Sequence, residues 1–223
     1  MTVLFIILCL IAAAAFICIE HKEKYVPAVV LKGTASVFFV ILGIIGSKMC
    51  ADASFAKLVL WGLVLGCIAD ILLNLRFCLK KIGKKVFLVG ILVFLAGHVM
   101  YIIALAKKCS CTIICVILGI AATAVLMYFI FKKITAEKAF KIFGIFYVGA
   151  VTIMTCIALG NYITAPSAWA GLFALGALLF LVSDVVMILN TFGKEQKFSL
   201  RITNLSLYYI GQVLIALSLQ FVK

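Results

Sequence analysis

Eight apolar runs, each of 18 residues or more, constrain the fold of this chain more than any other feature. At a rise of about 1.5 Å per residue, a helix of roughly 20 residues crosses a hydrocarbon core about 30 Å thick. Hydrophobic residues make up 67% of the chain, against roughly 45 to 50% in ordinary soluble domains. The predicted spans are 2–19, 27–46, 58–75, 86–106, 110–131, 140–160, 168–189 and 203–222.

Short connections separate these runs and leave no room for a soluble domain. The sequence therefore predicts an all-α fold, a polytopic membrane bundle of eight transmembrane helices in a single domain covering residues 1–223. Any activity must then lie within the bundle or at its edge, with the lipid bilayer as its surroundings.

The net charge of +13 is distributed in a way that indicates topology rather than nucleic-acid binding. Fourteen of the 20 Lys and Arg residues lie in or beside the connections between spans 1 and 2, 3 and 4, 5 and 6, and 7 and 8. Five lie at the opposite ends, and Lys32 lies inside a span. By the positive-inside rule we expect a bacterial-type cell membrane protein with both termini outside.

Two aspartates lie inside apolar spans, in the segments CIADILLNL (67–75) and LFLVSDVVMIL (179–189). A charged group at the bilayer centre costs about 2.5 to 3.5 kcal/mol on insertion scales, and such groups usually face a partner or a cavity. Asp70 and Asp184 each lie five residues before the cytoplasmic end of a span, which predicts a depth of about 8 Å for both. We therefore expect a polar site in the cytoplasmic half of the membrane.

A weak internal repeat relates the two aspartates. An offset of 114 residues superimposes Asp70 on Asp184 and the pair Gly97-His98 on Gly211-Gln212. Because each half then holds four spans, the duplication would be a 4+4 parallel repeat with both aspartates at one depth. The rest of the two halves match poorly, so a chance match stays open.

The direction in which Asp70 points follows from its helical spacing. Gly62, Gly66 and Asp70 recur every four residues, and a row of small residues usually marks a tight helix contact. We therefore expect Asp70 to face protein rather than lipid.

Two interpretations of these polar residues stay open. In the structural one, an aspartate neutralises Lys32 or accepts hydrogen bonds from tyrosines. In the functional one, two carboxyl groups in a polar pocket act as proton donor and base, as they do in glycosidases. Lys32 itself would either extend to the interface or bind a phosphodiester.

Metal or cofactor chemistry is not expected. Asp70, Asp184 and His98 would offer three ligands, but no second histidine lies within the membrane. Most of the nine cysteines are interpreted as small hydrophobic residues, and the CSC segment at 109–111 lies near the predicted outer face, where it could oxidise. Nucleotide-binding loops, HExxH motifs and serine nucleophile elbows are absent, so the residues favour acid/base chemistry.

Four segments together resemble the YhhN-like lysoplasmalogenase family of eight-span membrane proteins, and the resemblance covers most of the chain. They are WGLVLGCIADILLNL, FLVGILVFLAGHVMYI, GALLFLVSDVVMIL and LYYIGQVLIALSL. The family pattern falls on Asp70, on Phe94 with His98 and Tyr101, on Ser183 with Asp184, and on Tyr208 with Gln212. Two departures are Ala69, where the family often has glycine, and Lys32-Gly33, where it has Lys-Pro.

The resemblance implies hydrolysis of the vinyl ether bond of a lysoplasmalogen, or of a related single-chain enol-ether lipid, to a fatty aldehyde and a glycerophospho-headgroup. Its expected catalytic residues are Asp70, Asp184 and His98. Its expected substrate-binding residues are Lys32, Asn74, Tyr101, Ser183, Tyr208 and Gln212. The expected partner is a lysophospholipid substrate, with no nucleic acid and no obligate protein partner. The alternative is a proton- or cation-coupled transporter or a small-molecule binding bundle.

Overall fold

The computed structural model describes residues 1–223 as eight α-helices without a strand. The helices are α1 (Thr2–His21), α2 (Tyr25–Met49), α3 (Ala53–Cys78), α4 (Gly83–Ala106), α5 (Thr112–Lys133), α6 (Lys138–Thr164), α7 (Ala168–Phe192) and α8 (Phe198–Ser218), and a short 3-10 turn, η1 (Leu219–Phe221), follows. All eight are long and apolar enough to cross a membrane. The expected all-α polytopic bundle is confirmed, and the protein is a multi-pass membrane protein.

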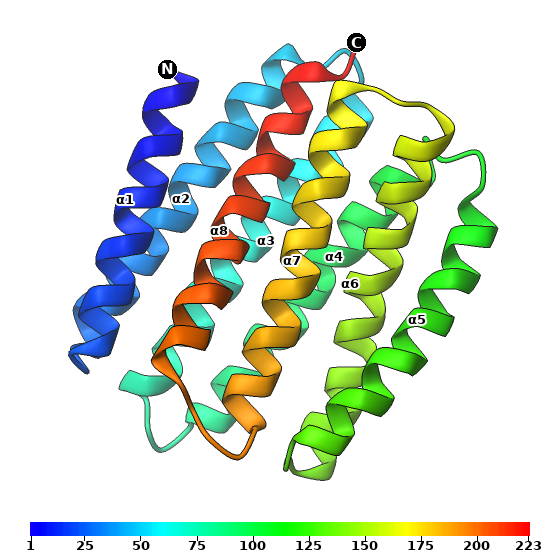
Figure 1. Ribbon diagram of the computed structural model, residues 1–223. Coiled ribbons are helices and arrows are strands. Elements are labelled where there is room, and N and C mark those ends of the chain that lie inside the picture. The colour runs from blue at the N-terminus through cyan, green and yellow to red at the C-terminus, as the bar shows by residue number, and fades with distance from the viewer.

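The helices form one bundle in which both chain termini lie at the same end (Figure 1). Four pairs of consecutive helices pack side by side: α1 lies against α2, α3 against α4, α5 against α6, and α7 against α8. The helices α2, α3, α4, α6, α7 and α8 surround the interior, whereas α5 lies at one edge of the bundle (Figure 1).

Several helices extend beyond the apolar runs that predict them. Helix α3 starts at Ala53 because Asp52 caps it, accepting a hydrogen bond of 2.9 Å from the backbone N–H of Phe55. Helix α8 starts at Phe198, five residues before its predicted span. Polar first and last turns thus lengthen the helices without changing which segments cross the membrane.

Glycines bring α3 against α4 and α7 against α8 at equivalent positions. A Cβ atom added at Gly97 would lie 3.2 Å from the carbonyl oxygen of Gly62, and one added at Gly211 would lie 2.8 Å from that of Gly176. Gly62 and Gly176 are 114 residues apart, as are Gly97 and Gly211. The offset that relates the two aspartates therefore also relates two close helix crossings.

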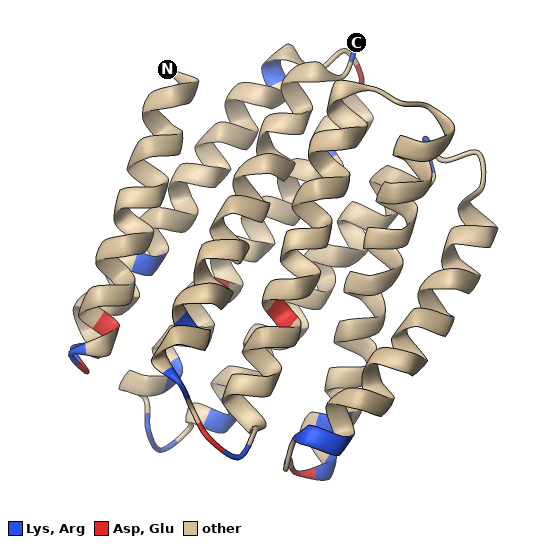
Figure 2. Cartoon of the chain, in the orientation of Figure 1, with Lys and Arg blue, Asp and Glu red and all other residues tan.

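Most of the positive charge lies at one end of the bundle. Lys and Arg residues gather around the connections α1–α2, α3–α4, α5–α6 and α7–α8, opposite the two termini (Figure 2). We call this the basic end. Thr135 and Phe192 tie two of its connections together through a backbone hydrogen bond of 2.8 Å.

Candidate active site

Asp70 lies on α3, about two turns before this helix ends at Cys78, and is surrounded by donors from two other helices. The Lys32 ammonium of α2 lies 3.1 Å from Oδ1, and the Ser36 hydroxyl, one turn along the same helix, donates to Oδ2 at 2.6 Å. The Tyr208 hydroxyl of α8 donates to the same Oδ2 at 2.5 Å. Asp70 is 1% exposed and Lys32 is 4% exposed. An ion pair and two hydrogen bonds therefore occupy both oxygens of this buried carboxyl group.

Asp184 lies on α7 in a different environment. It is 4% exposed, and the Tyr147 hydroxyl of α6 donates to its Oδ2 at 2.8 Å. No ion pair includes Asp184. A single neutral donor is a much weaker counterpart than the ammonium beside Asp70, because burial of an unpaired charge is costly.

Both carboxyl groups line one inner cavity of about 40 Å³. Its lining comes from α2, α3, α4, α6, α7 and α8 and consists of Lys32, Asp70, Leu73, Asn74, Arg76, Phe87, Phe94, Tyr147, Asp184, Met187, Arg201, Asn204, Leu205 and Tyr208. This volume accommodates water molecules but not a lipid chain. The inner cavity is thus large enough for water, and water in it would contact both carboxyl groups.

A wider cavity of about 300 Å³ opens at the basic end, and we call it the vestibule. It shares Arg76, Met187, Arg201 and Asn204 with the inner cavity, so the two adjoin. Glu20 of α1 binds the Arg201 guanidinium through two hydrogen bonds of 2.8 Å. A route therefore leads from the basic end of the bundle to the two carboxyl groups.

Arg76 differs from Arg201 in having no carboxylate partner. Its guanidinium carbon lies 4.6 Å from the ring centre of Phe77 and 4.1 Å from that of Phe87. Its Nε is buried and makes no hydrogen bond to protein. The Nδ2 atom of Asn74, half a turn away on α3, is likewise buried without a partner. Two groups of unused donors thus lie where the vestibule meets the inner cavity.

A chain of hydrogen bonds connects Asp70 to α4. Gln212 accepts from the Tyr101 hydroxyl at 3.3 Å, and its own Nε2 donates to the Tyr208 oxygen at 3.3 Å. Gly66 makes room for this chain, because a Cβ atom there would lie 3.1 Å from Gln212 Nε2. The row of small residues on α3 therefore faces protein, as expected, and leads to Asp70.

His98 lies outside the lining of the inner cavity. Its ring meets the ring of Phe180 edge-on at 4.8 Å and that of Tyr147 at 5.5 Å, and neither ring nitrogen has a partner in the protein. The structure therefore places His98 behind Tyr147, the residue that binds Asp184.

Most of the residues expected from the sequence meet in this region. Lys32, Asp70, Asn74, Asp184 and Tyr208 line the inner cavity. Tyr101 and Gln212 form the chain behind Tyr208, and the Ser183 hydroxyl accepts a hydrogen bond of 2.8 Å from Asn204. Lys32 forms an ion pair with Asp70 and does not extend to the interface. The ion pair is the contact that the structural interpretation requires, and the cavity beside it is the feature that the functional interpretation requires.

Ser36 and Tyr147 are partners of the aspartates that the sequence reasoning missed. The internal repeat places the counterpart of α2 on α6 but does not single out the second of them. Lys32 and Ser36 approach Asp70 from α2, and the 114-residue offset places their counterparts at 146 and 150 on α6. Tyr147, which binds Asp184, lies between these two positions.

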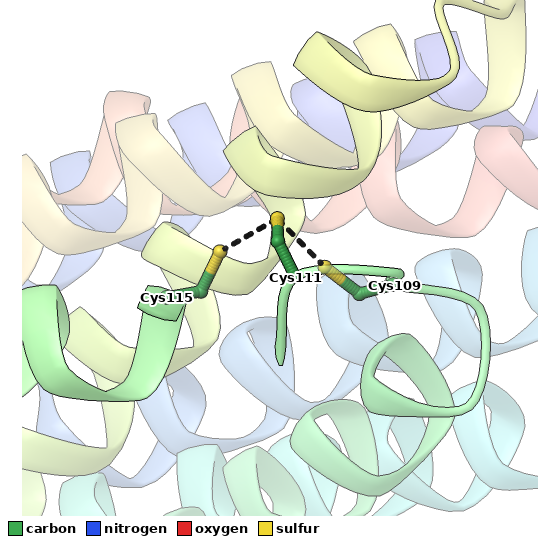
Figure 3. Close-up of side chains that lie close together, drawn as sticks. All are labelled: Cys109, Cys111 and Cys115. Atoms are coloured by element: carbon green, nitrogen blue, oxygen red, sulfur yellow. Dashed lines mark hydrogen bonds between the residues drawn. The ribbon is translucent and has the colours of Figure 1, made fainter. Parts of the chain in front are cut away.

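One group of three potential metal ligands converges in the structure, and it lies away from the two carboxyl groups. Cys109, Cys111 and Cys115 have Sγ atoms that all lie within 4.8 Å of one another (Figure 3). Asp70, Asp184 and His98 do not converge in this way.

Comparison with known proteins gives one family and one relative. A family model described as the YhhN family matches residues 27–219. A protein of Dictyostelium discoideum described as a lysoplasmalogenase homolog is 24% identical over 200 residues, which cover 74% of this chain. The match covers 63% of that relative, so this chain spans less than two thirds of its length. No solved structure is significantly similar to the chain.

Proposed function

Because the chain belongs to the YhhN family, we propose that it hydrolyses the vinyl ether bond of a lysoplasmalogen or a related single-chain enol-ether lipid. One observation carries the proposal: two carboxyl groups with unequal partners, Asp70 and Asp184, line the same buried cavity. Vinyl ether hydrolysis needs an acid that protonates carbon and an anion that stabilises the cation formed. The products are a fatty aldehyde and a glycerophospho-headgroup.

The partners assign the two roles. Asp70, beside the Lys32 ammonium, is the carboxylate, and Asp184, which has only the Tyr147 hydroxyl, is the acid. Asp184 transfers its proton to the β-carbon of the vinyl ether, and the positive charge that develops on the ether carbon and oxygen is stabilised by Asp70. A water molecule adds to this carbon and returns a proton to Asp184. The hemiacetal then collapses to the aldehyde and the glycerol hydroxyl.

The positions of three adjoining cavities, rather than their volumes, suggest where the three parts of a single-chain lipid bind. A third cavity, of about 40 Å³ and mostly apolar, lies among α4, α5, α6 and α7 and shares Phe87, Tyr147 and Met187 with the inner cavity. We assign the alkenyl chain to this region, the vinyl ether to the inner cavity and the headgroup to the vestibule. Because the two inner volumes are small, the helices around Tyr147 must separate when the lipid binds.

Arg76 is the group that we assign to the phosphate. It is a cation without a carboxylate partner, held between two rings at the inner end of the vestibule. Lys32, to which a phosphate role was also open, already has Asp70 as a partner. A guanidinium binds phosphate oxygens through two parallel hydrogen bonds.

The charge distribution supports one orientation. We place the basic end, and with it the vestibule, at the cytoplasmic face, and both termini outside. A lysophospholipid would then enter from the cytoplasmic leaflet. His98 acts in this proposal as a positioning residue for Tyr147, with its ring nitrogens available to a water molecule.

The first test is aldehyde release by the purified protein in detergent. We expect aldehyde from a lysoplasmalogen, none from an ester-linked lysophospholipid, and none above background from Asp184→Asn. A folded protein that releases no aldehyde would favour the transporter alternative, in which the aspartates relay protons or cations. The continuous helices argue against that alternative, because Pro27 lies in the first turn of α2 and Pro166 in the connection between α6 and α7.

A second test addresses the headgroup. Arg76→Gln should raise KM for a lysoplasmalogen about 10- to 100-fold, the range expected for a hydrogen bond to a charged group. KM for an alkenyl glycerol without phosphate should not change. The exposed Lys80 lies in the next connection, so Lys80→Gln is a matched loss of charge that should leave both values unchanged.

A further inference from the structure

Three cysteine side chains point toward one another at the end of the bundle opposite the basic end (Figure 3). The Sγ atom of Cys111 lies 3.7 Å from that of Cys109 and 3.6 Å from that of Cys115. Cys109 and Cys111 belong to the connection between α4 and α5, and Cys115 lies in the first turn of α5. The cluster is separate from the two carboxyl groups, and the proposed hydrolysis has no use for it.

Hydrogen bonds to backbone carbonyl groups hold the segment that carries the three cysteines. The N–H of Cys109 donates to the Leu105 carbonyl at 3.1 Å, and the Thr112 hydroxyl donates to the Cys109 carbonyl at 2.9 Å. The N–H of Cys115 donates to the Cys111 carbonyl at 3.1 Å, which places these two residues one helical turn apart on one face. The sulfur atoms therefore converge without any change in the fold.

Helix α6 leaves space for the sulfur atoms at Gly160. A Cβ atom there would lie 3.3 Å from the Sγ atoms of Cys109 and Cys111, and closer still to that of Cys115. Cys109 and Cys115 are buried, whereas Cys111 is partly exposed. The cluster is thus enclosed on the protein side and reachable from outside.

We propose that Cys109, Cys111 and Cys115 bind one soft monovalent metal cation, of which Cu(I) is the example. Thiolates select soft metals such as Cu(I). With metal–sulfur bonds of about 2.3 Å, sulfur atoms on one metal lie roughly 3.8 to 4.0 Å apart, close to the separations seen here. Structural zinc sites have four protein ligands, and this group has three, which suits a trigonal cation. Each thiol releases its proton on binding, and the N-terminus of α5 favours the resulting negative charge.

The test is a titration of the reduced, purified full-length protein with Cu(I) against a chromogenic Cu(I) chelator. We expect one tightly held Cu(I) per chain. The variant Cys109→Ser/Cys111→Ser/Cys115→Ser should lose it. The matched control, Cys18→Ser/Cys78→Ser/Cys156→Ser, removes three thiols that lie outside the cluster and should bind as the unaltered protein does.

Gly160→Ala tests the geometry rather than the thiol count. Its Cβ atom should displace the Cys115 sulfur and weaken Cu(I) binding at least tenfold while all nine cysteines remain. Equal Cu(I) binding by the cluster variant, or Zn²⁺ that displaces Cu(I) from the site, would overturn the proposal. A disulfide within the cluster of the protein isolated without reductant, seen by mass spectrometry, would also overturn it and assign the cysteines to thiol oxidation.

Discussion

Asp70 and Asp184 occupy equivalent positions in the two halves of the chain, yet their partners differ. Asp70 receives an ammonium and a hydroxyl from α2 and a second hydroxyl from α8. Asp184 receives one hydroxyl from α6, the counterpart of α2 in the other half. The proposed roles of the two carboxyl groups rest on this difference, because one of them has a cation beside it and the other does not.

The largest expected effect is on catalysis. Asp184→Asn removes the proposed proton donor and should lower kcat by about 100- to 10,000-fold, the usual contribution of general acid catalysis. The helical content and the thermal midpoint in detergent should stay close to those of the unaltered protein, since Asp184 has no ionic partner to leave behind. Aldehyde release measures the loss of activity, and circular dichroism measures the helical content and the thermal midpoint. Full activity in this variant would mean that Asp184 is not the proton donor.

Substitution of either aspartate should abolish activity, but the two substitutions should differ in their effect on thermal stability. Asp70→Asn also abolishes turnover in the proposal, but it leaves the Lys32 ammonium buried without its counter-charge. Breaking a buried pair from one side costs about 3 to 5 kcal/mol, so the thermal midpoint should fall clearly.

The double variant Lys32→Met/Asp70→Asn is the control for this explanation. It removes both charges and should recover most of the lost thermal stability while remaining inactive, because an apolar replacement of a buried pair is often neutral. If Asp184→Asn destabilised the protein as much as Asp70→Asn does, the proposed difference between the two carboxyl groups would be wrong.

A smaller effect compares the hydroxyl donors. Tyr147→Phe removes the hydroxyl partner of Asp184 and should lower kcat about tenfold, the value of a hydrogen bond worth roughly 1.4 kcal/mol. Ser36→Ala leaves Asp70 with Lys32 and Tyr208 and should change kcat about two- to threefold.

The sequence predicts the scaffold well and directs attention to two aspartates that the structure buries, because insertion into a bilayer allows few folds and makes an intramembrane aspartate conspicuous. It predicts the partners less well. Lys32 is one of several residues that the sequence offers as a partner of an aspartate, whereas Ser36 and Tyr147 resemble many other hydroxyl residues on apolar helices. Their role depends on how α2 and α6 are rotated in the bundle, which packing decides. Arg76 is one of five Lys and Arg residues in or beside the same predicted connection. The sequence does not distinguish it from the others, because its lack of a partner depends on the fold.

The smallest expected effect concerns a partly exposed ion pair, whose contribution to stability can be compared with that of the buried pair of Lys32 and Asp70. The Lys108 Nζ atom lies 2.8 Å from Oδ2 of Asp52, and both side chains are partly exposed. This hydrogen bond lowers the pKa of the Asp52 carboxyl group below its ordinary value of 3.8. The pair therefore stabilises the fold above about pH 4, and this contribution is lost as the pH falls through the lowered pKa. Asp52→Asn keeps a side chain able to cap α3, so it should cost only about 0.2 to 1 kcal/mol at pH 7. The difference from the unaltered protein in thermal midpoint should vanish near pH 2, whereas a cost that persists there would mean that the loss of charge is not its cause.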